Sequence, residues 1–399
     1  MLPLGDSPET SPGAEAVELS VVLPCLNEAD TVAACIHEAR QTLSECGIDG
    51  EVVIADNGST DDSREIALVA GARVVLVPSR GYGSALMGGI EAARGKYVLM
   101  ADADGSYDLR EIPRFLEKLR EGYQLVQGCR LKSGGGRVLP GAMPFLHRFW
   151  GNPMFSRMAR LWFKAPIHDI HCGMRAFSKE LYLGLGQTCT GMEFASEMII
   201  KATLQGARVS EVPITLRPDR RASRPPHLRT FRDGWRHLRF FLLFSPRWLF
   251  LIPGAALILL GLVGYALAMP GTRIRGVQFD VHTLLFASLA MICGYQSILF
   301  AVMTKVFAIT NNLLPPDRRM TRLFELVNLE KGLLTGGAMM VAGALLLLAA
   351  VAQWRAAGFG ALDPTRTLRW VIPGVTLTTL GIQTLLSSFF LSILGLKRR

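Results

Sequence analysis

Three clusters of polar side chains in the first half of the chain have the residue types needed to hold a charged ligand. They are Pro24-Cys25-Leu26-Asn27-Glu28, Asp56-Asn57-Gly58-Ser59-Thr60-Asp61-Asp62 and Asp102-Ala103-Asp104-Gly105. In the third cluster, two aspartates directly follow an apolar segment and would repel one another without a cation. Mg²⁺ and Mn²⁺ prefer oxygen ligands supplemented by substrate phosphates. The sequence therefore predicts a metal at Asp102 and Asp104, with Asp104 as the expected direct ligand.

Each cluster also has a simpler structural explanation. Asn27 or Asp30 could cap a following helix, and Ser59 or Thr60 could cap another, with acidic residues in its first turn. The third cluster could be a solvated acidic loop. No G-x-G-x-x-G follows the first apolar segment, and no G-x-x-x-x-G-K-[ST] is present. Neither a dinucleotide site nor an ATPase motor is therefore indicated.

The segments around these clusters alternate between strand and helix patterns. Predicted strands are Leu19–Pro24, Glu51–Ala55, Arg73–Val77, Tyr97–Ala101 and Leu125–Gly128, and predicted helices are Ala29–Cys46, Ser59–Ala70, Gly81–Ala93 and Leu109–Glu121. Apolar strands that alternate with amphipathic helices indicate an α/β fold, with a parallel sheet covered on both faces. Ligands bind such sheets beyond the carboxyl ends of the strands. We therefore expect the three polar clusters to meet at one sheet edge.

Composition divides the chain into halves of opposite charge. Half of the 399 residues are apolar, which excludes a disordered or low-complexity protein. Residues 1–204 carry 20 basic and 25 acidic side chains, a net charge of −5, whereas residues 205–399 carry 23 basic and 8 acidic ones, a net charge of +15. Because the positive charge accompanies the most apolar sequence, a membrane surface is favoured over a nucleic acid as its partner.

Four segments without Asp, Glu, Lys or Arg account for the apolar second half. They are residues 248–269, 281–304, 332–354 and 370–396. Each exceeds the ~20 residues that a helix needs to cross ~30 Å of hydrocarbon. Trp248, Trp354 and Trp370 lie at segment ends, where indole rings favour the membrane interface. These features predict four transmembrane helices rather than buried helices of a large soluble core.

Loop charges predict how these helices are oriented. Basic side chains gather between the second and third segments and in the tail, at Lys305, Arg318, Arg319, Arg322, Lys331, Lys397, Arg398 and Arg399. The positive-inside rule then places these regions and residues 1–247 in the cytoplasm. We expect a multi-pass protein of the cell (inner or plasma) membrane with a cytoplasmic C-terminus.

The N-terminus and the cysteines agree with this location. Residues 1–16 have neither the basic start nor the apolar centre of a signal peptide, and we expect a disordered tail there. The seven cysteines are odd in number and include no C-x-x-C pair. Free thiols in a reducing compartment are the simplest explanation.

A basic amphipathic segment, Thr230–Phe244, precedes the first predicted span. One helical stripe contains Phe231, Trp235, Leu238 and Leu242, and another contains Arg229, Arg232, Arg236 and Arg239. Such a helix favours the membrane interface, where arginines reach anionic headgroups. The alternative is an ordinary amphipathic core helix, but the position directly before a span favours the interface.

The order P-x-x-N-E, D-x-G-S-x-D and D-x-D-G resembles glycosyltransferase family 2, which has the nucleotide-sugar-binding type-A fold. The resemblance continues at Gly128-Cys129-Arg130, at DIHCGMR from Asp169 to Arg175, at Glu211-Val212-Pro213-Ile214 and at Arg232-Asp233-Gly234-Trp235. It covers about residues 19–245. The motifs are typical of polyprenyl-phosphate glycosyltransferases, similar to dolichyl-phosphate mannose and glucose synthases. They are specific for the family and weak for the sugar.

This resemblance implies an organisation in four parts. A disordered tail (1–16) would precede a cytoplasmic catalytic domain (17–228) with a Rossmann-like, mostly parallel sheet. An interfacial amphipathic helix (229–247) and a membrane domain (248–399) would follow. The implied reaction is inverting transfer of one hexose from a nucleotide sugar, of the UDP-glucose or GDP-mannose class, to polyprenyl or dolichyl phosphate at the cytoplasmic membrane face. The sugar, the base, the polyprenol length and the oligomeric state stay open.

The resemblance also implies roles for individual residues. Its donor pocket would comprise Pro24, Asn27, Glu28, Asp56 and Asp102, and its acceptor side would comprise Asp169, Arg175 and Glu193. The family often has Ser and Phe where this chain has Cys172 and Met174, which weakens any hydrogen-bonding role at position 172. For Glu193, an ordinary acidic first turn of a helix is an equal alternative.

The expected acceptor predicts a role for arginine. A polyprenyl phosphate is already an anion at pH 7 and needs no general base, only cations that place its oxygen behind the anomeric carbon. Arg130 is the first candidate for binding the acceptor phosphate, because a guanidinium group fits phosphate. Arg137, in a loop that we expect to be mobile, is the second. Either could instead be a plain surface charge. Further basic side chains that could guide the phosphate or bind bulk lipid are Arg217, Arg220, Arg221 and Arg224.

Two other functions are less favoured by the sequence than hexose transfer to a lipid phosphate. A processive polysaccharide synthase would need an acceptor base and, in the family, a Q-x-x-R-W segment, which is absent. A transporter or flippase with a non-catalytic domain is disfavoured because the spans contain no Asp, Glu, Lys or Arg. The His168-to-Cys172 segment has metal-binding residue types, but on a strand His168 and His171 would point to opposite faces, which disfavours zinc.

Overall fold

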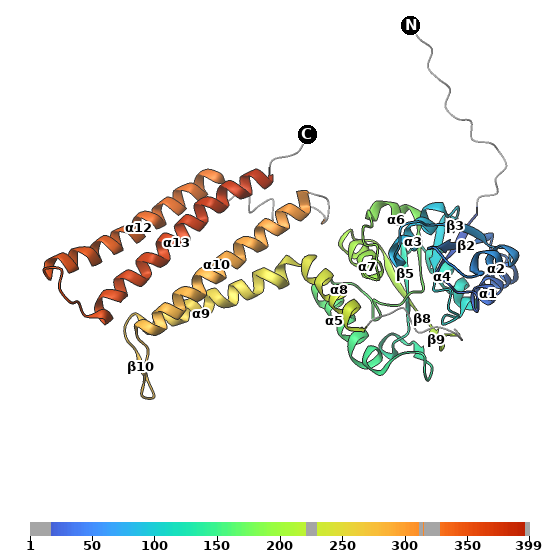
Figure 1. The fold of residues 1–399 in the computed structure, drawn as a ribbon, viewed down its shortest axis with the longest axis horizontal. Coiled ribbons are helices and arrows are strands. Elements are labelled where there is room, and N and C mark those ends of the chain that lie inside the picture. The colour runs from blue at the N-terminus through green and yellow to red at the C-terminus, as the bar shows by residue number, and fades with distance from the viewer. Residues whose placement is uncertain (1–16, 221–229, 311–313, 315–327, 396–399) are drawn as a thin grey trace, which may run out of the picture. The chain divides into compact units, whose positions relative to one another are not determined.

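The computed structural model describes residues 17–220, 230–310, 314 and 328–395 (Figure 1). The chain divides into two compact units, Met1–Phe240 and Phe241–Arg399. Several predictions lie outside the described residues: those on the 1–16 tail and on Arg221, Arg224, Arg229, Arg318, Arg319, Arg322, Lys397, Arg398 and Arg399.

A seven-stranded sheet forms the centre of the first unit, in the order β3-β2-β1-β4-β7-β5-β8. Its strands are β1 (Leu19–Cys25), β2 (Gly50–Asp56), β3 (Arg73–Leu76), β4 (Tyr97–Met100), β5 (Leu125–Cys129), β7 (Arg175–Ser178) and β8 (Val209–Pro213). Only β7 is antiparallel to its neighbours, β4 and β5. A separate short pair joins β6 (Arg137–Val138) to β9 (Thr215–Leu216). The prediction of a mostly parallel α/β sheet is therefore confirmed.

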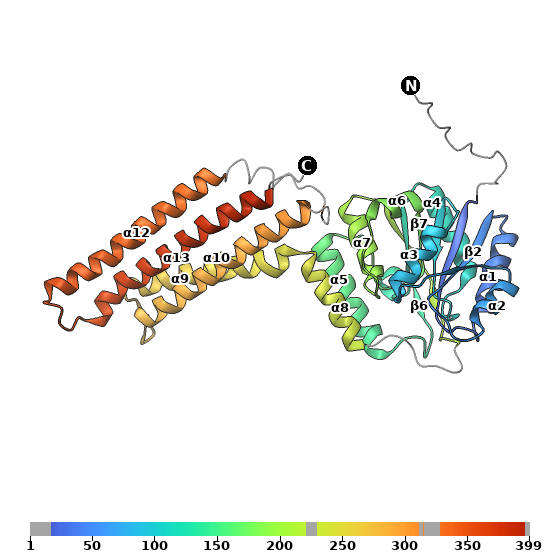
Figure 2. The ribbon, with the colours of Figure 1, turned by 45° about the horizontal axis from the view of Figure 1, so that its top comes forward.

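Helices cover both faces of this sheet (Figure 2). The helices that precede the membrane helices are α1 (Val32–Glu45), α2 (Ser63–Val69), α3 (Tyr82–Ala92), α4 (Ile112–Arg120), α5 (Asn152–Phe163), α6 (Lys179–Leu185), α7 (Phe194–Leu204) and α8 (Thr230–Leu243), with the 3₁₀ turn η1 (Leu109–Glu111) directly before α4. Val21 and Leu23 join the core that contains α1 and α4. Val22 points the other way, because a Cβ atom on Gly89 of α3 would lie 2.6 Å from Val22 Cγ1. Burial on both faces explains why β1 is apolar at nearly every position.

Four long helices are present in the described part of the second unit, residues 241–310, 314 and 328–395. The helices long and apolar enough to cross a membrane are Arg247–Ala268, Val281–Thr310, Leu329–Ala356 and Pro364–Leu394. They correspond to η4 (Arg247–Leu251) with α9 (Ile252–Ala268), α10 (Val281–Thr310), α12 (Leu329–Ala356) and α13 (Pro364–Gly395). The hairpin of β10 (Arg273–Ile274) and β11 (Val277–Gln278) joins α9 to α10. The four predicted transmembrane helices are therefore confirmed, and the protein is a multi-pass membrane protein.

Small residues allow these helices to pack closely. Gly254 of α9 faces Gly294 of α10, and a Cβ atom on Gly254 would lie 2.8 Å from the Gly294 carbonyl oxygen. Gly336 of α12 faces Gly381 of α13 in the same way. Close backbone approach through glycine is the usual basis of helix packing in lipid, where no hydrophobic force draws helices together.

Candidate active site

The three polar clusters meet at the carboxyl edge of the sheet. Cys25 pairs with Asp56 in the parallel register of β1 and β2, and Val22 pairs with Met100 in that of β1 and β4. The Thr31 hydroxyl donates to the Ala103 carbonyl oxygen at 2.7 Å, which ties the third cluster to the start of α1. The expected convergence is therefore a feature of the structure.

The first two clusters interlock instead of capping helices. Asn27 has a φ of 61°, a left-handed conformation that asparagine tolerates better than most residues. Its backbone N–H donates to Ser59 Oγ at 2.9 Å, and its Oδ1 accepts from the Thr60 backbone N–H at 2.7 Å. The Glu28 backbone N–H donates to Ser63 Oγ at 2.8 Å. Helix α1 begins after Thr31 and α2 after Asp62, neither with a side-chain capping bond, so the capping explanation is wrong.

Asp56 is buried and shapes the turn that follows β2. Its carboxylate accepts backbone N–H groups of Gly58 and Ser59 at 3.1 and 3.2 Å. Arg64 Nε of α2 approaches Asp56 Oδ2 at 2.8 Å, which balances the buried charge. Pro24 is the half-buried sixth residue of β1, and Glu28 is buried beside Thr31. All four predicted donor residues of these two clusters therefore lie at this edge.

Asp102 and Asp104 are half-buried where β4 ends. Tyr82 Oη donates to Asp102 Oδ1 at 3.0 Å, and a Cβ atom on Gly173 would lie 2.9 Å from Asp102 Oδ2. The Asp104 Oδ1 atom accepts from the Ser106 backbone N–H at 2.9 Å, and the Asp104 carbonyl accepts from the Arg220 N–H at 3.1 Å. Both aspartates are thus oriented by neighbours from distant parts of the chain.

This pair of carboxylates fits a hard divalent cation. Mg²⁺ and Mn²⁺ take oxygen ligands, and Mg²⁺ is usually bound by one or two carboxylates together with substrate phosphates and water. Within residues 17–220, 230–310 and 328–395, no group of three or more His, Cys, Asp or Glu side chains could hold a metal. A cation at Asp102 and Asp104 would therefore need further oxygens from a bound ligand.

Two tyrosines that were not predicted from the sequence organise this site: Tyr82, which is half-buried, and Tyr107, which is buried. Burial raises the pKa of Tyr82 well above its usual value, and the Asp102 charge raises it further, so Tyr82 keeps its proton as a hydrogen-bond donor. Tyr107 Oη accepts from the Gly173 backbone N–H at 2.8 Å. Tyr82 opens the glycine-rich helix α3, and its aromatic ring beside small residues was the only signal available in the sequence.

Arg130 and Asp169 form a buried ion pair. Arg130 Nε lies 2.7 Å from Asp169 Oδ2, and Nη2 lies 2.9 Å from Oδ1. The Arg130 backbone N–H also donates to Asp169 Oδ2 at 3.1 Å. Burial opposes the charge on Arg130, but the attraction of Asp169 raises the pKa of Arg130 well above its usual value. The structure thus brings these two predicted acceptor residues together, and the role of Arg130 toward a phosphate stays a prediction.

Arg175 is buried and supports the backbone around this pair. Its guanidinium donates to the carbonyl oxygens of Ala195 at 2.6 Å and of Cys172 at 2.8 Å. Burial lowers the pKa of Arg175, because the interior disfavours its charge. These bonds hold the start of α7 against the 170–172 turn, so Arg175 positions other groups.

Glu193 and Arg137 differ in their placement. Glu193 precedes α7, and the neighbouring Thr190 carbonyl accepts from the Ser84 backbone N–H at 3.2 Å, close to Tyr82 at the start of α3. Glu193 Oε2 is buried without a hydrogen-bond partner in the part of the chain that the structure describes.

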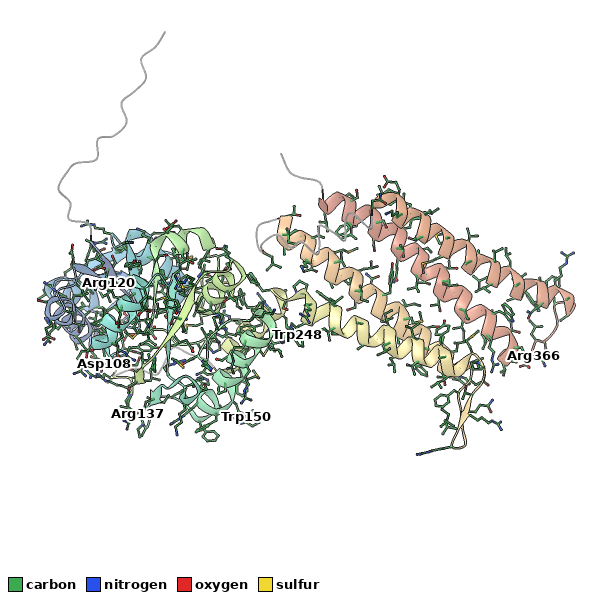
Figure 3. All side chains as sticks on the ribbon, turned by 180° about the vertical axis from the view of Figure 1, so that it is seen from behind. Asp108, Arg120, Arg137, Trp150, Trp248 and Arg366 are labelled. Atoms are coloured by element: carbon green, nitrogen blue, oxygen red, sulfur yellow. The ribbon has the colours of Figure 1, made fainter. Side chains whose placement is uncertain are left out.

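Arg137 is exposed on β6 (Figure 3). The predicted loop around it is a 3₁₀ turn followed by a strand, since Arg137 N–H donates to the Ile214 carbonyl at 2.9 Å.

The 168–172 segment is a turn, so its interpretation as a strand was wrong. His168 Nδ1 lies 2.7 Å from Glu211 Oε2, whereas His171 Nδ1 lies 3.1 Å from Asn152 Oδ1. The His171 ring lies 4.3 Å from that of His237 on α8. The two imidazoles of this segment are therefore held by different elements, through packing and not through strand alternation.

Exposed apolar side chains gather on two helices of the first unit. The segment of η3 (His147–Gly151) and α5 exposes Phe145, Leu146, Phe149, Trp150, Met154 and Leu161, and α8 exposes Phe231 and Trp235. Helices α5 and α8 lie side by side in both views (Figures 1 and 2), with the Phe155 and His237 rings 5.9 Å apart. The apolar stripe of α8 was predicted from the sequence, whereas that of the η3 and α5 segment was not. The apolar residues of this segment are interleaved with Arg148, Arg157, Arg160 and Lys164.

Comparisons with known proteins agree with this architecture. Residues 20–185 match glycosyl transferase family 2, and residues 302–395 match the glycosyltransferase family 2 C-terminal transmembrane region. The low-salt glycan biosynthesis hexosyltransferase Agl6 of Haloferax volcanii is 36% identical over 391 residues, which cover 95% of this chain and 90% of the relative. The dolichyl-phosphate hexose transferase of the same organism is 34% identical over 203 residues, which cover 50% of this chain and 83% of the relative.

Among solved structures, glucosyl-3-phosphoglycerate synthase from Mycobacterium tuberculosis with Mn²⁺, UDP and glucosyl-3-phosphoglycerate is similar to part of this chain. It is 24% identical, with a TM-score of 0.45, over 57% of this chain and 78% of that chain. The match to Agl6 extends over nearly the whole of both chains, and the two matched regions cover the sheet apart from β8, together with the last membrane helices. This protein therefore belongs to glycosyltransferase family 2, as a glycosyltransferase with a C-terminal membrane region.

Proposed function

We propose that this glycosyltransferase moves one hexose from a nucleotide sugar to a polyprenyl or dolichyl phosphate at the cytoplasmic face of the cell membrane, with inversion. The observation that carries the proposal is the pair Asp102 and Asp104 at a sheet edge shared with Asn27 and Asp56, in a chain that also has four membrane helices. Similarity to Agl6 and to a dolichyl-phosphate hexose transferase supports a hexose donor and a lipid phosphate acceptor.

The donor side follows from the placement of the carboxylates. Mg²⁺ or Mn²⁺ held by Asp104 and Asp102 would neutralise the diphosphate leaving group when bound. Tyr82 keeps the Asp102 carboxylate in one orientation through its 3.0 Å hydrogen bond. Asn27, Glu28 and Asp56 surround the turn between β2 and α2, where we place the base and ribose.

The acceptor side needs cations, since a phosphate anion requires no general base. Its oxygen attacks the anomeric carbon on the face opposite the diphosphate. The new carbon–oxygen bond forms as the old one breaks, and the electron pair leaves with the diphosphate. Arg220 is an exposed cation whose backbone N–H is bonded to the Asp104 carbonyl, so we add it to Arg130 and Arg137 as an acceptor candidate.

The test uses the purified full-length protein, labelled UDP-glucose or GDP-mannose, Mg²⁺ or Mn²⁺ and a short polyprenyl phosphate. One donor should give an organic-extractable labelled lipid. Asp104→Ala should lower this rate at least about 100-fold, since electrostatic groups of this kind contribute about 10²–10³. The matched control is Asp49→Ala, which removes an exposed carboxylate directly before β2, at the other end of that strand from Asp56, and should leave the rate within about twofold.

The outcomes separate the two parts of the proposal. An active Asp104→Ala variant with an unchanged thermal unfolding midpoint would remove the metal assignment. If a panel of nucleotide sugars yields labelled sugar on hydroxyl acceptors and none on polyprenyl phosphate, the acceptor assignment is wrong while the metal assignment stands.

A further inference from the structure

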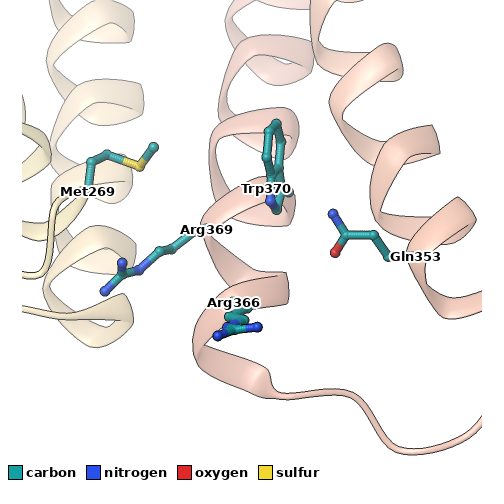
Figure 4. Close-up of a pocket in the computed structure, with 5 residues that line it drawn as sticks. All are labelled: Met269, Gln353, Arg366, Arg369 and Trp370. Atoms are coloured by element: carbon teal, nitrogen blue, oxygen red, sulfur yellow. The ribbon is translucent and has the colours of Figure 1, made fainter. Parts of the chain in front are cut away.

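A pocket of about 510 Å³ opens within the membrane unit, where α9 and α12 end and α13 begins (Figure 4). Its lining residues are Met269, Gln353, Arg366, Arg369 and Trp370. The first span, made of η4 and α9, begins at Arg247 and ends at Ala268, so the pocket lies at the end of the spans opposite the one that α8 precedes. The site at Asp102 and Asp104 has no part in it.

Arg369 is held at the wall of this pocket. Its Nη2 lies 2.9 Å from Asp280 Oδ1, just before α10. The backbone closes around the guanidinium, because a Cβ atom on Gly271 would lie 2.8 Å from Arg369 Nη2. The Arg369 Nε atom is buried and lacks a hydrogen-bond partner among the described residues. A guanidinium group with five N–H donors thus has donors left over after its single carboxylate contact.

Arg366 supplies a second guanidinium one helical turn away. Its side chain is 89% exposed, and its one carboxylate neighbour among the described residues, Asp363, lies at 3.9 Å. Segments 269–280 and 355–369 together carry five basic and two acidic side chains, a net charge of +3. The pocket therefore favours an anion, and paired guanidinium groups fit the oxygens of a phosphate.

The remaining walls place this anion at the depth of lipid headgroups. Trp370 lines the pocket beside Gln353, and Trp354 packs edge-on against Phe359 with ring centroids 5.0 Å apart. Indole rings favour the membrane interface. Charged side chains begin here at Arg355 and Asp363, after a span without charge. An occupant with a phosphate at this level would run its chains along the apolar helices.

We propose that the pocket binds the phosphate of an anionic lipid in the leaflet opposite to the one that α8 adjoins. Two sources share this chemistry: a phospholipid such as phosphatidylglycerol, and a polyprenyl phosphate or its glycosylated form. The proposal needs only the membrane insertion of the second unit and does not depend on the proposed reaction.

The experiment measures lipid binding to the full-length protein by native mass spectrometry from detergent micelles. Phosphatidylglycerol and farnesyl phosphate are titrated separately. Arg366→Gln should weaken binding about fivefold for one of these lipids, as expected for one interfacial charge acting on an anionic lipid. Arg369→Gln combined with Asp280→Asn should weaken it further, without leaving an unpaired carboxylate. Arg355→Gln is the matched control, because Arg355 is exposed at the same helix end but does not line the pocket.

Each result has a defined meaning. Selective weakening of phosphatidylglycerol binding supports the proposal and identifies a phospholipid. Selective weakening of farnesyl phosphate binding supports it and identifies the polyprenyl class. Equal affinities in wild type, Arg366→Gln and the double variant overturn it. So does an effect of Arg355→Gln as large as that of Arg366→Gln, which would indicate general surface charge. Arg366 is exposed, so Arg366→Gln should keep the wild-type unfolding midpoint.

Discussion

Buried pairing decides what individual residues of the site can do. The Arg130 guanidinium and the Asp169 carboxylate neutralise one another's charge through two side-chain hydrogen bonds. The Arg175 guanidinium donates hydrogen bonds to backbone carbonyl oxygens. A buried charge that loses its partner is strongly destabilising, because the interior does not replace the lost hydration. Two of the arginines expected to meet a ligand therefore also hold the backbone between β5 and β7.

Arg130→Ala should lower the free energy of unfolding by about 3–5 kcal/mol, because Asp169 would stay buried and charged. The measurement is denaturant unfolding of the first unit within the detergent-solubilised chain. Adding Asp169→Asn should recover part of the loss, as a double-mutant cycle would show. Should Arg130→Ala keep its stability and raise only the KM for the lipid phosphate, the acceptor role stands and the structural role is wrong.

At the scale of elements, exposed apolar side chains of the first unit gather on the segment of η3 and α5 and on α8. Aromatic side chains next to arginines are exposed in η3, directly before α5, and on α8, which is the composition of segments that lie at a lipid interface. A lipid phosphate cannot leave the bilayer surface, so a site that uses one must be held close to it. We therefore propose that α5 shares with α8 the docking role predicted for α8 alone.

Phe149→Ser combined with Trp150→Ser should slow transfer to a long-chain polyprenyl phosphate in bilayers by at least about tenfold, since the loss of apolar burial at even one aromatic side chain is about 1.5–3 kcal/mol. Transfer to a short acceptor in detergent should change little. Val69→Ser on α2 is the control, because Val69 is 90% exposed on another helix. Equal losses with both acceptors would contradict docking and indicate a damaged site.

Orientation in the membrane belongs to the whole molecule. Four helices long enough to span a bilayer return the chain to the side on which it began, and the loop charges favour the cytoplasm for that side. Neither a single residue nor a single helix carries this information.

Reporter fusions test this orientation in cells. A fusion at Arg399 should report a cytoplasmic location, and one inserted at Gly276 between β10 and β11 should report the opposite side. The reason is the even number of spans, together with the basic residues predicted inside. Both fusions on the same side would contradict the three spans between these positions. Exchanged locations at both positions would keep the spans and contradict the loop-charge argument.

Local patterns determined the elements of this protein from the sequence. Strands β1, β2 and β4 were predicted because apolar runs ending in polar clusters are typical of buried parallel strands, and these clusters do meet. The four membrane helices were predicted because hydrocarbon thickness sets the length of uncharged sequence that spans it. Both signals reside within some 25 consecutive residues, so no knowledge of distant contacts was needed.

Only the tertiary structure decided how distant residues pair. The insertion of antiparallel β7 between β4 and β5 brings Gly173 against Asp102, and no periodicity within either segment predicts that contact. The hydrogen bond from Tyr82 to Asp102 and the ion pair of Arg369 with Asp280 likewise join residues from elements that only the fold brings together. Polar side chains find partners according to which elements pack together, and that packing is a property of the whole fold, whereas chain length and hydrophobic period are local.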